Sequence, residues 1–122
     1  MERVRIVVIE DDADNLELVH ILLDQGGFEV LTAMDGQSGL ELVREKLPAL
    51  VLLDLTIPEI DGWHLAHQFK GDPQTQTIKV IALTAHAMPG DRKHALESGC
   101  DGYITKPLDV RNFADQIRSY LE

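Results

Sequence analysis

The sequence predicts an α/β fold, a doubly wound sandwich with a parallel sheet between two layers of helices. Three observations support this prediction. Short β-branched runs alternate with longer stretches of helical spacing, and the two kinds of segment repeat five times. The short runs are apolar almost throughout, which is typical of parallel strands covered on both faces. Glycine, proline and aspartate residues stand at the junctions. Repeated strand and helix units are joined by right-handed crossovers, which place helices on both faces of the sheet.

The predicted strands are five short runs in which apolar residues predominate. They cover residues 4–9, 28–33, 50–54, 78–83 and 102–104. Side chains that branch at Cβ favour extended backbone because they pack well on a pleated surface. Each run also has the length of a strand and is too short for a typical helix.

Three helices are predicted from apolar stripes at spacings of i, i+3, i+4 and i+7. The stripes are Leu16, Val19, Leu22 and Leu23, then Leu40, Val43 and Leu47, and finally Phe113, Ile117, Tyr120 and Leu121. Gly26 and Gly27 follow the first helix, where a left-handed C-cap fits. Pro48 stops the second helix, and Asp109 is placed to cap the N-terminus of the last.

Two further helices have weaker stripes. Residues 62–70 form a short helix with Leu65, Ala66 and Phe69 as its inward face. Residues 88–98 are mostly polar, with few apolar side chains to anchor them. We therefore expect this helix to be the most mobile element.

Composition and charge fit one folded domain over residues 1–122, with no second domain. The formal net charge is −10, from 21 acidic and 11 basic residues, which argues against nucleic acid and an anionic membrane surface as direct partners. Cys100 has no second cysteine to pair with, so we expect a small buried residue. The sequence shows no secretory signal and no apolar segment near the roughly 20 residues that span a bilayer, which predicts a cytoplasmic location.

Polar side chains follow the predicted strands at their carboxyl ends. Glu10 and Asp11 follow the first strand, Asp54 ends the third, Thr84 follows the fourth and Lys106 follows the fifth. In open α/β sheets, ligands bind at this edge, near the point where the strand order reverses. Three carboxylates, a hydroxyl and an amine are therefore expected to converge on one crevice.

Ordinary structural roles would also account for most of these residues taken singly. The acids at 10–12 fit a solvated loop and a helix cap, with Asp12 as the cap. Thr84 fits a threonine whose hydroxyl bonds the backbone at a strand end, and Lys106 fits a surface lysine in a turn. Asp54 is harder to explain in this way, because a carboxylate that follows four apolar strand residues needs a partner or a cation.

The residues around Asp54 favour Mg²⁺ and phosphoryl transfer. Carboxylates without a nearby histidine form a hard, oxygen-only site, which suits Mg²⁺ better than zinc or copper. A cation would also neutralise the crowded charges of Glu10, Asp11, Asp12 and Asp14. With a lysine and a hydroxyl beside a further carboxylate, such a site is equipped for phosphoryl transfer, because that chemistry needs charge neutralisation and in-line positioning.

Four stretches together resemble the receiver domain of two-component response regulators, in particular the single-domain kind that acts in chemotaxis. They are VIEDD, LLDLTIPEIDG, LTAHAMPGD and GYITKP, in the order and spacing of that family. The resemblance covers essentially the whole chain. It implies a five-stranded, flavodoxin-like (βα)5 fold with the strand order 2-1-3-4-5.

The resemblance also implies a metal site and a phosphoacceptor. Asp54 matches the aspartate that takes a phosphoryl group from a phosphohistidine and becomes an aspartyl phosphate. Mg²⁺ would be held by Asp11 directly, by Glu10 directly or through water, by Asp54, and by the backbone carbonyl of Thr56.

A second set of residues matches the family's switch positions. Lys106 would pair with the phosphoryl oxygens and Asp54. Thr84 would turn its hydroxyl onto the phosphoryl group, helped by the Ala85 amide, and Tyr103 would swing inward behind it. A half-buried strand residue is the alternative interpretation of Tyr103, and the two interpretations are compatible.

Two positions match those that tune hydrolysis of the acyl phosphate in the family. Here they are Thr56 and His86, which carry no carboxylate or amide to orient water. We therefore expect hydrolysis that is not especially fast, and a phosphoryl lifetime of only seconds would refute this.

The implied function is that of a phosphoacceptor in a two-component or phosphorelay pathway. The expected partners are a histidine kinase or histidine phosphotransfer protein, and a downstream protein bound by the face of helix 88–98, strand 102–104 and the last helix. The chain is expected to be a monomer or weak dimer. It would not be an enzyme beyond catalysing its own phosphorylation and dephosphorylation.

Other functions remain open on the sequence. A Mg²⁺-dependent phosphohydrolase would normally carry a second acid two residues after its nucleophile, where this chain has Thr56. A flavin or nucleotide module needs a glycine- or hydroxyl-rich phosphate loop after the first strand, and here that loop is acidic. A receiver excised from a longer regulator or hybrid kinase is a third alternative.

Overall fold

The computed structural model describes residues 3–54, 62–84, 97, 99–105 and 108–121. Its strands are β1 (Arg5–Ile9), β2 (Glu29–Ala33), β3 (Leu50–Asp54), β4 (Lys79–Thr84) and β5 (Gly102–Thr105). Its helices are α1 (Ala13–Gln25), α2 (Gly36–Lys46), α3 (Gly62–Gly71) and α5 (Phe113–Leu121). Most of the helix predicted over residues 88–98 lies outside the described residues.

The five strands form one parallel sheet in the order β2-β1-β3-β4-β5. β1 pairs with β2 on one side and with β3 on the other, so that Ile9 lies opposite both Ala33 and Leu53. The carboxyl ends of β1 and β3 are therefore neighbours at the point where the strand order reverses. The predicted fold class and the strand order 2-1-3-4-5 are confirmed.

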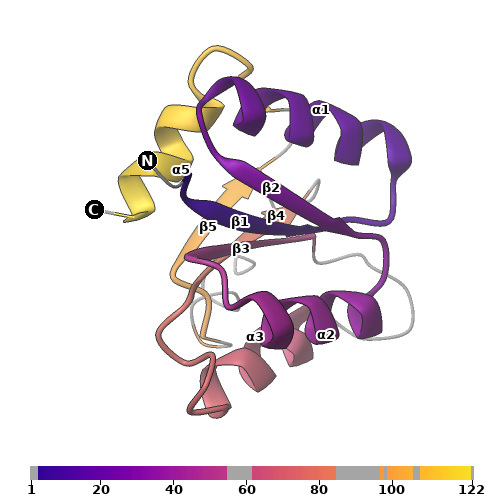
Figure 1. Ribbon diagram of the computed structural model, residues 1–122, viewed down its shortest axis with the longest axis vertical. Helices are drawn as coiled ribbons and strands as arrows, with labels where there is room; N and C mark the ends of the chain where they lie inside the picture. Colours follow the sequence, from indigo (N-terminus) through magenta and orange to yellow (C-terminus); the bar gives the residue numbers. More distant parts are fainter. Residues whose placement is uncertain (1–2, 55–61, 85–96, 98, 106–107, 122) are drawn as a thin grey trace.

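Helices cover both faces of the sheet, with α1 and α5 on one face and α2 and α3 on the other (Figure 1). Because side chains alternate along a strand, each face has its own core. The core under α1 and α5 contains Ile6, Val8, Val19, Leu23, Phe28, Leu50, Leu52, Ile81, Leu83, Ile104, Phe113 and Ile117. The core under α2 and α3 contains Val7, Ile9, Leu40, Val43, Val51, Leu53, Leu65, Ala66, Phe69, Ile78, Val80, Ala82 and Cys100. Burial on both faces explains why the strands are apolar throughout.

Two aspartates cap the helices that follow β1 and β2. The Asp12 carboxylate accepts a hydrogen bond from the Asp14 backbone N–H at 3.0 Å, which confirms Asp12 as the N-cap of α1. Asp35 caps α2 in the same way and accepts from the Ser38 backbone N–H at 2.7 Å. Each cap satisfies a backbone donor that the first helical turn leaves without an intrahelical partner.

The left-handed turn predicted after α1 is made by Gly27, whose φ is +93°. Gly26, the C-cap residue itself, stays in the right-handed region, and its N–H donates to the Leu22 carbonyl at 3.1 Å. The prediction that this glycine pair ends the helix is therefore confirmed, with the positive φ one residue beyond the C-cap.

The prediction that Leu47 continues the apolar stripe of α2 was wrong. The helix ends at Lys46, and Leu47 takes a left-handed conformation with φ of 45° and is 55% exposed. The residue before a proline is disfavoured in the helical region, so Pro48 forces the chain out of the helix at this position.

Asp109 lies one turn further from the last helix than predicted. α5 begins at Phe113, whose N–H donates to the Asp109 carbonyl at 2.8 Å. The Asp109 carboxylate accepts from the Arg111 N–H at 3.2 Å. Asp109 therefore caps the turn that leads into α5, and it does not directly precede the helix.

Two arginines near opposite ends of the chain hold the turn between α1 and β2. Arg3 donates to the Gly27 carbonyl from Nε at 3.1 Å, and to the Phe28 carbonyl from Nη2. Arg118 donates from Nη2 to the Gly26 carbonyl at 2.8 Å, and its guanidinium lies 5.4 Å from the centroid of the Phe28 ring. The turn precedes β2, so both arginines bind at the amino edge of the sheet.

Candidate functional site

Three of the predicted site residues form one acidic cluster at the carboxyl edge of the sheet. Glu10, Asp11 and Asp54 each offer a carboxylate oxygen, and these oxygens lie within 4.8 Å of one another. Glu10 and Asp54 are buried, at 0% and 1% exposure, whereas Asp11 is exposed to solvent. The cluster is therefore open on the side of Asp11.

The pairing of β1 with β3 creates this cluster. Ile9 is paired with Leu53 in the parallel register, so the residues that follow them, Glu10 and Asp54, come to the same edge. The Glu10 backbone N–H donates to the Ala33 carbonyl at 3.0 Å, which extends the pairing with β2 by one residue. The two buried acids are thus held by β1 and β3, whose apolar side chains are almost completely buried.

Asp12 turns the chain from the cluster into α1. Its backbone N–H donates to Glu10 Oε1 at 3.3 Å, and its carbonyl accepts from the Leu16 N–H at 2.9 Å. Its carboxylate caps the helix and does not belong to the cluster. The sequence predicted the cap but gave no sign of the hydrogen bond to Glu10, because a backbone donor carries no residue signature.

The remaining predicted residues are described only in part. β4 ends at Thr84, whose backbone is paired with Thr105 at the end of β5. Tyr103 lies in β5, is half-buried and packs against the core under α2 and α3. Its interpretation as a half-buried strand residue is confirmed. The predictions for Thr56, Ala85, His86 and Lys106 fall outside the described residues.

The donor set of the cluster is chemically suited to Mg²⁺. All three side chains are carboxylates, and Mg²⁺ binds oxygen ligands and commonly takes one or two carboxylates together with waters and phosphate oxygens. Burying two carboxylates close together is costly unless positive charge compensates them. A divalent cation beside the exposed Asp11 would supply that charge and keep part of its shell open to solvent.

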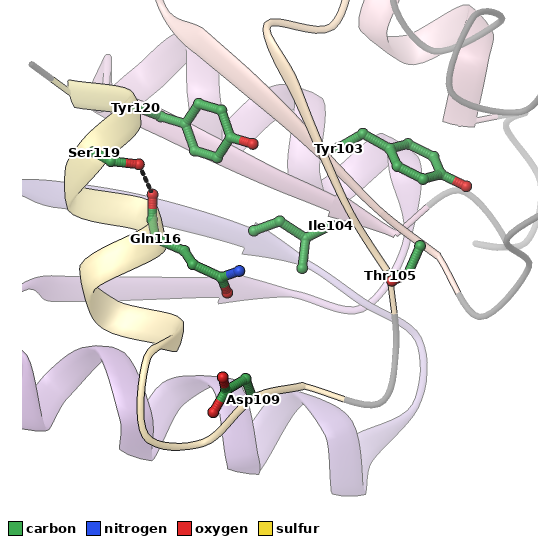
Figure 2. A pocket seen from close by; sticks show the side chains of 7 residues that line it. All are labelled: Tyr103, Ile104, Thr105, Asp109, Gln116, Ser119 and Tyr120. Carbon is green, nitrogen blue, oxygen red and sulfur yellow. Dashed lines mark hydrogen bonds between the residues drawn. The ribbon is translucent and has the colours of Figure 1, made fainter.

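A separate cavity of ≈340 Å³ lies between β5 and α5. It is lined by Tyr103, Ile104, Thr105, Asp109, Gln116, Ser119 and Tyr120 (Figure 2). Its lining is polar apart from the aromatic rings and Ile104, and the Ser119 hydroxyl donates to the Gln116 carbonyl at 2.6 Å. The cavity shares no residue with the acidic cluster. Among the predicted site residues that the structure describes, Tyr103 borders it.

Sequence comparison gives the class of the protein. The response regulator receiver domain family matches residues 6–118, and the chain belongs to that family. Receiver domains act in two-component signalling, where they interact with histidine kinases and with downstream targets. The resemblance of the four motifs is therefore confirmed at the level of the family.

Individual relatives agree with this assignment. The polar-differentiation response regulator DivK of Brucella anthropi is 37% identical over 116 residues, which are 95% of this chain and 94% of the relative. A response regulator receiver domain protein of Methanospirillum hungatei JF-1 is 27% identical, with a TM-score of 0.89 over 98% of this chain and 94% of the other.

A third comparison concerns a receiver domain that belongs to a sensor kinase. The receiver domain of sensor histidine kinase PA1611 from Pseudomonas aeruginosa PAO1 was solved with a magnesium ion coordinated in its active-site cleft. It is 23% identical, with a TM-score of 0.89 over 98% of each chain. At this identity the likeness shows the shared fold.

Among the described residues, none of the helices is both long enough and apolar enough to cross a membrane.

Proposed function

We propose that this receiver domain accepts a phosphoryl group on Asp54 in a Mg²⁺-dependent reaction and thereby switches a protein-binding face. The observation that carries the proposal is the position of Asp54. It ends β3, is buried at 1% exposure, and has a carboxylate oxygen within 4.8 Å of oxygens of Glu10 and Asp11. A carboxylate between two others at the ligand-binding edge of the sheet is placed both to hold a cation and to act as a nucleophile.

The donor in this proposal is the phosphohistidine of a histidine kinase or a histidine phosphotransfer protein. An Asp54 oxygen attacks the phosphorus, the phosphorus–nitrogen bond of the donor breaks, and the histidine leaves. Bound Mg²⁺ would neutralise charge on the phosphoryl oxygens and on the acids. Asp11, Glu10 and Asp54 would hold the ion, with the backbone carbonyl of Thr56 as a fourth protein ligand.

Binding and readout of the phosphoryl group are assigned to the other strand ends. Lys106 would pair with its oxygens, and Thr84 with the Ala85 amide would hydrogen-bond them. Tyr103 would then turn inward from β5. The topology supports these roles, because Thr84 ends β4, which pairs with β3, and its backbone is paired with Thr105 at the end of β5.

The proposed output is contact with a downstream protein on the face of residues 88–98, β5 and α5. The cavity between β5 and α5 supports this, since it lies on that face and is lined by residues of both elements (Figure 2). The Tyr103 ring itself points to the other side of β5, toward the core under α2 and α3. Phosphorylation would shift an existing equilibrium between two forms of this face. The chain would catalyse only its own phosphorylation and dephosphorylation, as one domain and as a monomer or weak dimer.

Intact mass measured after incubation with acetyl phosphate tests the proposal. The native chain is expected to gain one phosphoryl group with Mg²⁺ and none with EDTA, and Asp54→Asn is expected to gain none. Asp35→Asn is the matched control, because Asp35 is also an aspartate near the carboxyl end of a strand but lies outside the acidic cluster. Equal labelling of Asp54→Asn, or no labelling of a folded native chain, would contradict the proposal.

A further inference from the structure

Asp12 is the third of three successive acids, and the structure separates it from the other two. Its Oδ1 accepts from the Asp14 backbone N–H at 3.0 Å, and its Oδ2 accepts from Asn15 Nδ2 at 3.3 Å. Both oxygens are thus engaged by the first turn of α1. The group of acids suited to a metal consists of Glu10, Asp11 and Asp54 and does not include it.

The backbone of Asp12 faces the other way, toward the acidic cluster. Its N–H donates to Glu10 Oε1 at 3.3 Å. With φ of −87° and ψ of 113°, Asp12 has the extended backbone typical of an N-cap residue. It is therefore the last residue of the loop, and its side chain caps the first turn of the helix. One residue therefore joins the start of α1 to the carboxylate of Glu10.

We infer that Asp12 is a positioning residue for the metal site, in that its helix cap fixes the amide that orients Glu10. This inference rests on the proposed function, since it concerns how the same acids hold Mg²⁺. Glu10 is anchored at its backbone by the Ala33 carbonyl and at its carboxylate by the Asp12 amide. A glutamate side chain has several rotatable bonds, and holding it in the binding geometry beforehand reduces the entropy lost when the ion binds.

The negative charge of Asp12 also attracts a cation, so the two contributions must be separated. Serine caps helices nearly as well as aspartate but has no charge, and alanine has neither the charge nor the capping oxygen. Asp12→Ser and Asp12→Ala therefore lose the same charge and differ only in the cap. The difference in Mg²⁺ affinity between the two variants reports the positioning effect alone.

Asp35 provides a matched control. It caps α2 through the same kind of hydrogen bond, which its carboxylate accepts from the Ser38 N–H at 2.7 Å. The hydrogen bond to Glu10 comes from the Asp12 backbone N–H and not from that of Asp35. Asp35→Ser and Asp35→Ala therefore report the effect of losing a cap elsewhere in the fold. Urea unfolding of all four variants measures the general loss of stability.

The experiment is isothermal titration calorimetry of the full chain with MgCl₂ in the absence of any phosphodonor. We expect Asp12→Ala to bind Mg²⁺ about fivefold more weakly than Asp12→Ser, within the range that loss of a capping oxygen is worth. We expect Asp35→Ala and Asp35→Ser to bind it equally. If Asp12→Ala does not fold, Asp12→Gly replaces it, because glycine also lacks the capping oxygen; since glycine costs little at an N-cap, the expected loss of Mg²⁺ affinity relative to Asp12→Ser is then smaller, about twofold or less.

Three results would overturn the inference, and they differ from a failure of the proposed function. Equal Mg²⁺ affinities of Asp12→Ser and Asp12→Ala would show that Asp12 affects the ion through its charge alone. If Mg²⁺ affinity falls from the serine to the alanine variant by the same factor at Asp12 and at Asp35, the effect would be one of general stability and not of positioning. No Mg²⁺ binding by the native chain would overturn both this inference and the metal site. Native Mg²⁺ binding with an unlabelled Asp54 in acetyl phosphate would contradict only the phosphoacceptor role.

Discussion

At the scale of single residues, the fold changes the acid–base chemistry of Cys100. It is 5% exposed and lies just before β5. Burial raises the pKa of its thiol from 9.0 to about 11, and the neighbouring Asp101 carboxylate adds to the shift. The Lys70 ammonium opposes it, and that ammonium is paired with Asp101 at 2.6 Å. The folded chain therefore keeps this thiol protonated where an unfolded chain would not.

This pKa shift predicts a loss of stability in alkali. In the unfolded chain the thiol loses its proton near pH 9, whereas in the folded chain it keeps the proton until about pH 11. The contribution of the thiol to the free energy of unfolding is therefore fully present below pH 9 and is lost as the pH rises toward 11. The total loss is about 2–3 kcal/mol. Urea unfolding from pH 8 to 11 checks this, with Cys100→Ala as the variant that lacks the titrating group.

Between pH 9 and 11, the free energy of unfolding of the native chain should fall more steeply with pH than that of Cys100→Ala. The titrating groups that both proteins share contribute equally to the two curves and cancel in the comparison. We also expect iodoacetamide to alkylate the thiol more slowly in the folded chain than in the chain unfolded in urea, both at pH 8. Parallel stability curves for the native chain and Cys100→Ala, together with rapid alkylation, would contradict it.

The acids of the site could be predicted residue by residue because each ends or follows a strand. Asp54 was singled out since a carboxylate after four apolar residues is unusual, and Glu10 and Asp11 because charges crowd there. Their distances could not be predicted, because these depend on the register of β1 and β3. The amide of Asp12 could not be predicted either, since any residue has one.

At the scale of elements, the strands could be placed to within one residue of their observed ends. Their apolar runs are continuous because both faces of the sheet are covered, so the ends of each strand are clear in the sequence. Helix ends were harder to place. Leu47 fits the stripe of α2 by spacing, but the following proline removes it from the helix. Asp109 has the chemistry of a cap, yet a further turn separates it from α5.

Packing between α2 and β1 depends on a glycine that has no signature in the apolar pattern. A Cβ added at Gly39 would lie 2.4 Å from Cδ1 and 2.7 Å from Cγ1 of Ile9, which is itself fully buried. The helix can approach the strand only because this side chain is absent. The close approach supports the end of β1, directly before Glu10.

Gly39→Ala is therefore expected to destabilise the fold by about 1–3 kcal/mol, the usual cost of overpacking a core. Gly71→Ala is the matched control, because Gly71 is also helical and a Cβ there meets nothing within 4 Å. It should be neutral or stabilising by up to about 1 kcal/mol, since alanine restricts the unfolded chain. Urea unfolding followed by circular dichroism measures both, and equal effects of the two substitutions would contradict the packing argument.

At the scale of the whole molecule, the sheet brings most of the predicted chemistry to one edge. The five strands are parallel, so all their carboxyl ends meet there, and the acids that follow β1 and end β3 become neighbours. The net charge of −10 makes this edge more favourable for cations. A site assembled from separate strands exists only in the folded chain.

Mg²⁺ is therefore expected to raise the thermal midpoint of unfolding. An ion that binds the folded state at about 100 times its dissociation constant stabilises it by about 2.7 kcal/mol. NaCl at matched ionic strength should give a smaller increase, because it only screens the charges. Circular dichroism on heating measures the midpoint, and EDTA should reverse the effect of Mg²⁺.

Glu10→Gln should lose most of this stabilisation, because Glu10 belongs to the acidic cluster. Glu45→Gln is the control, since Glu45 is exposed near the end of α2 and pairs with Lys46 at 3.8 Å. The same response to Mg²⁺ in both variants would show that the ion acts through the overall charge of the protein.

The turn held by Arg3 and Arg118 has a consequence for modular architecture. Both arginines, from opposite ends of the chain, bind neighbouring carbonyls of one turn at the amino edge of the sheet. Polypeptide attached at either end would thus leave the domain on the same side, away from the acidic cluster. A receiver with this arrangement can be joined in tandem to other domains while its acidic cluster stays accessible to a kinase.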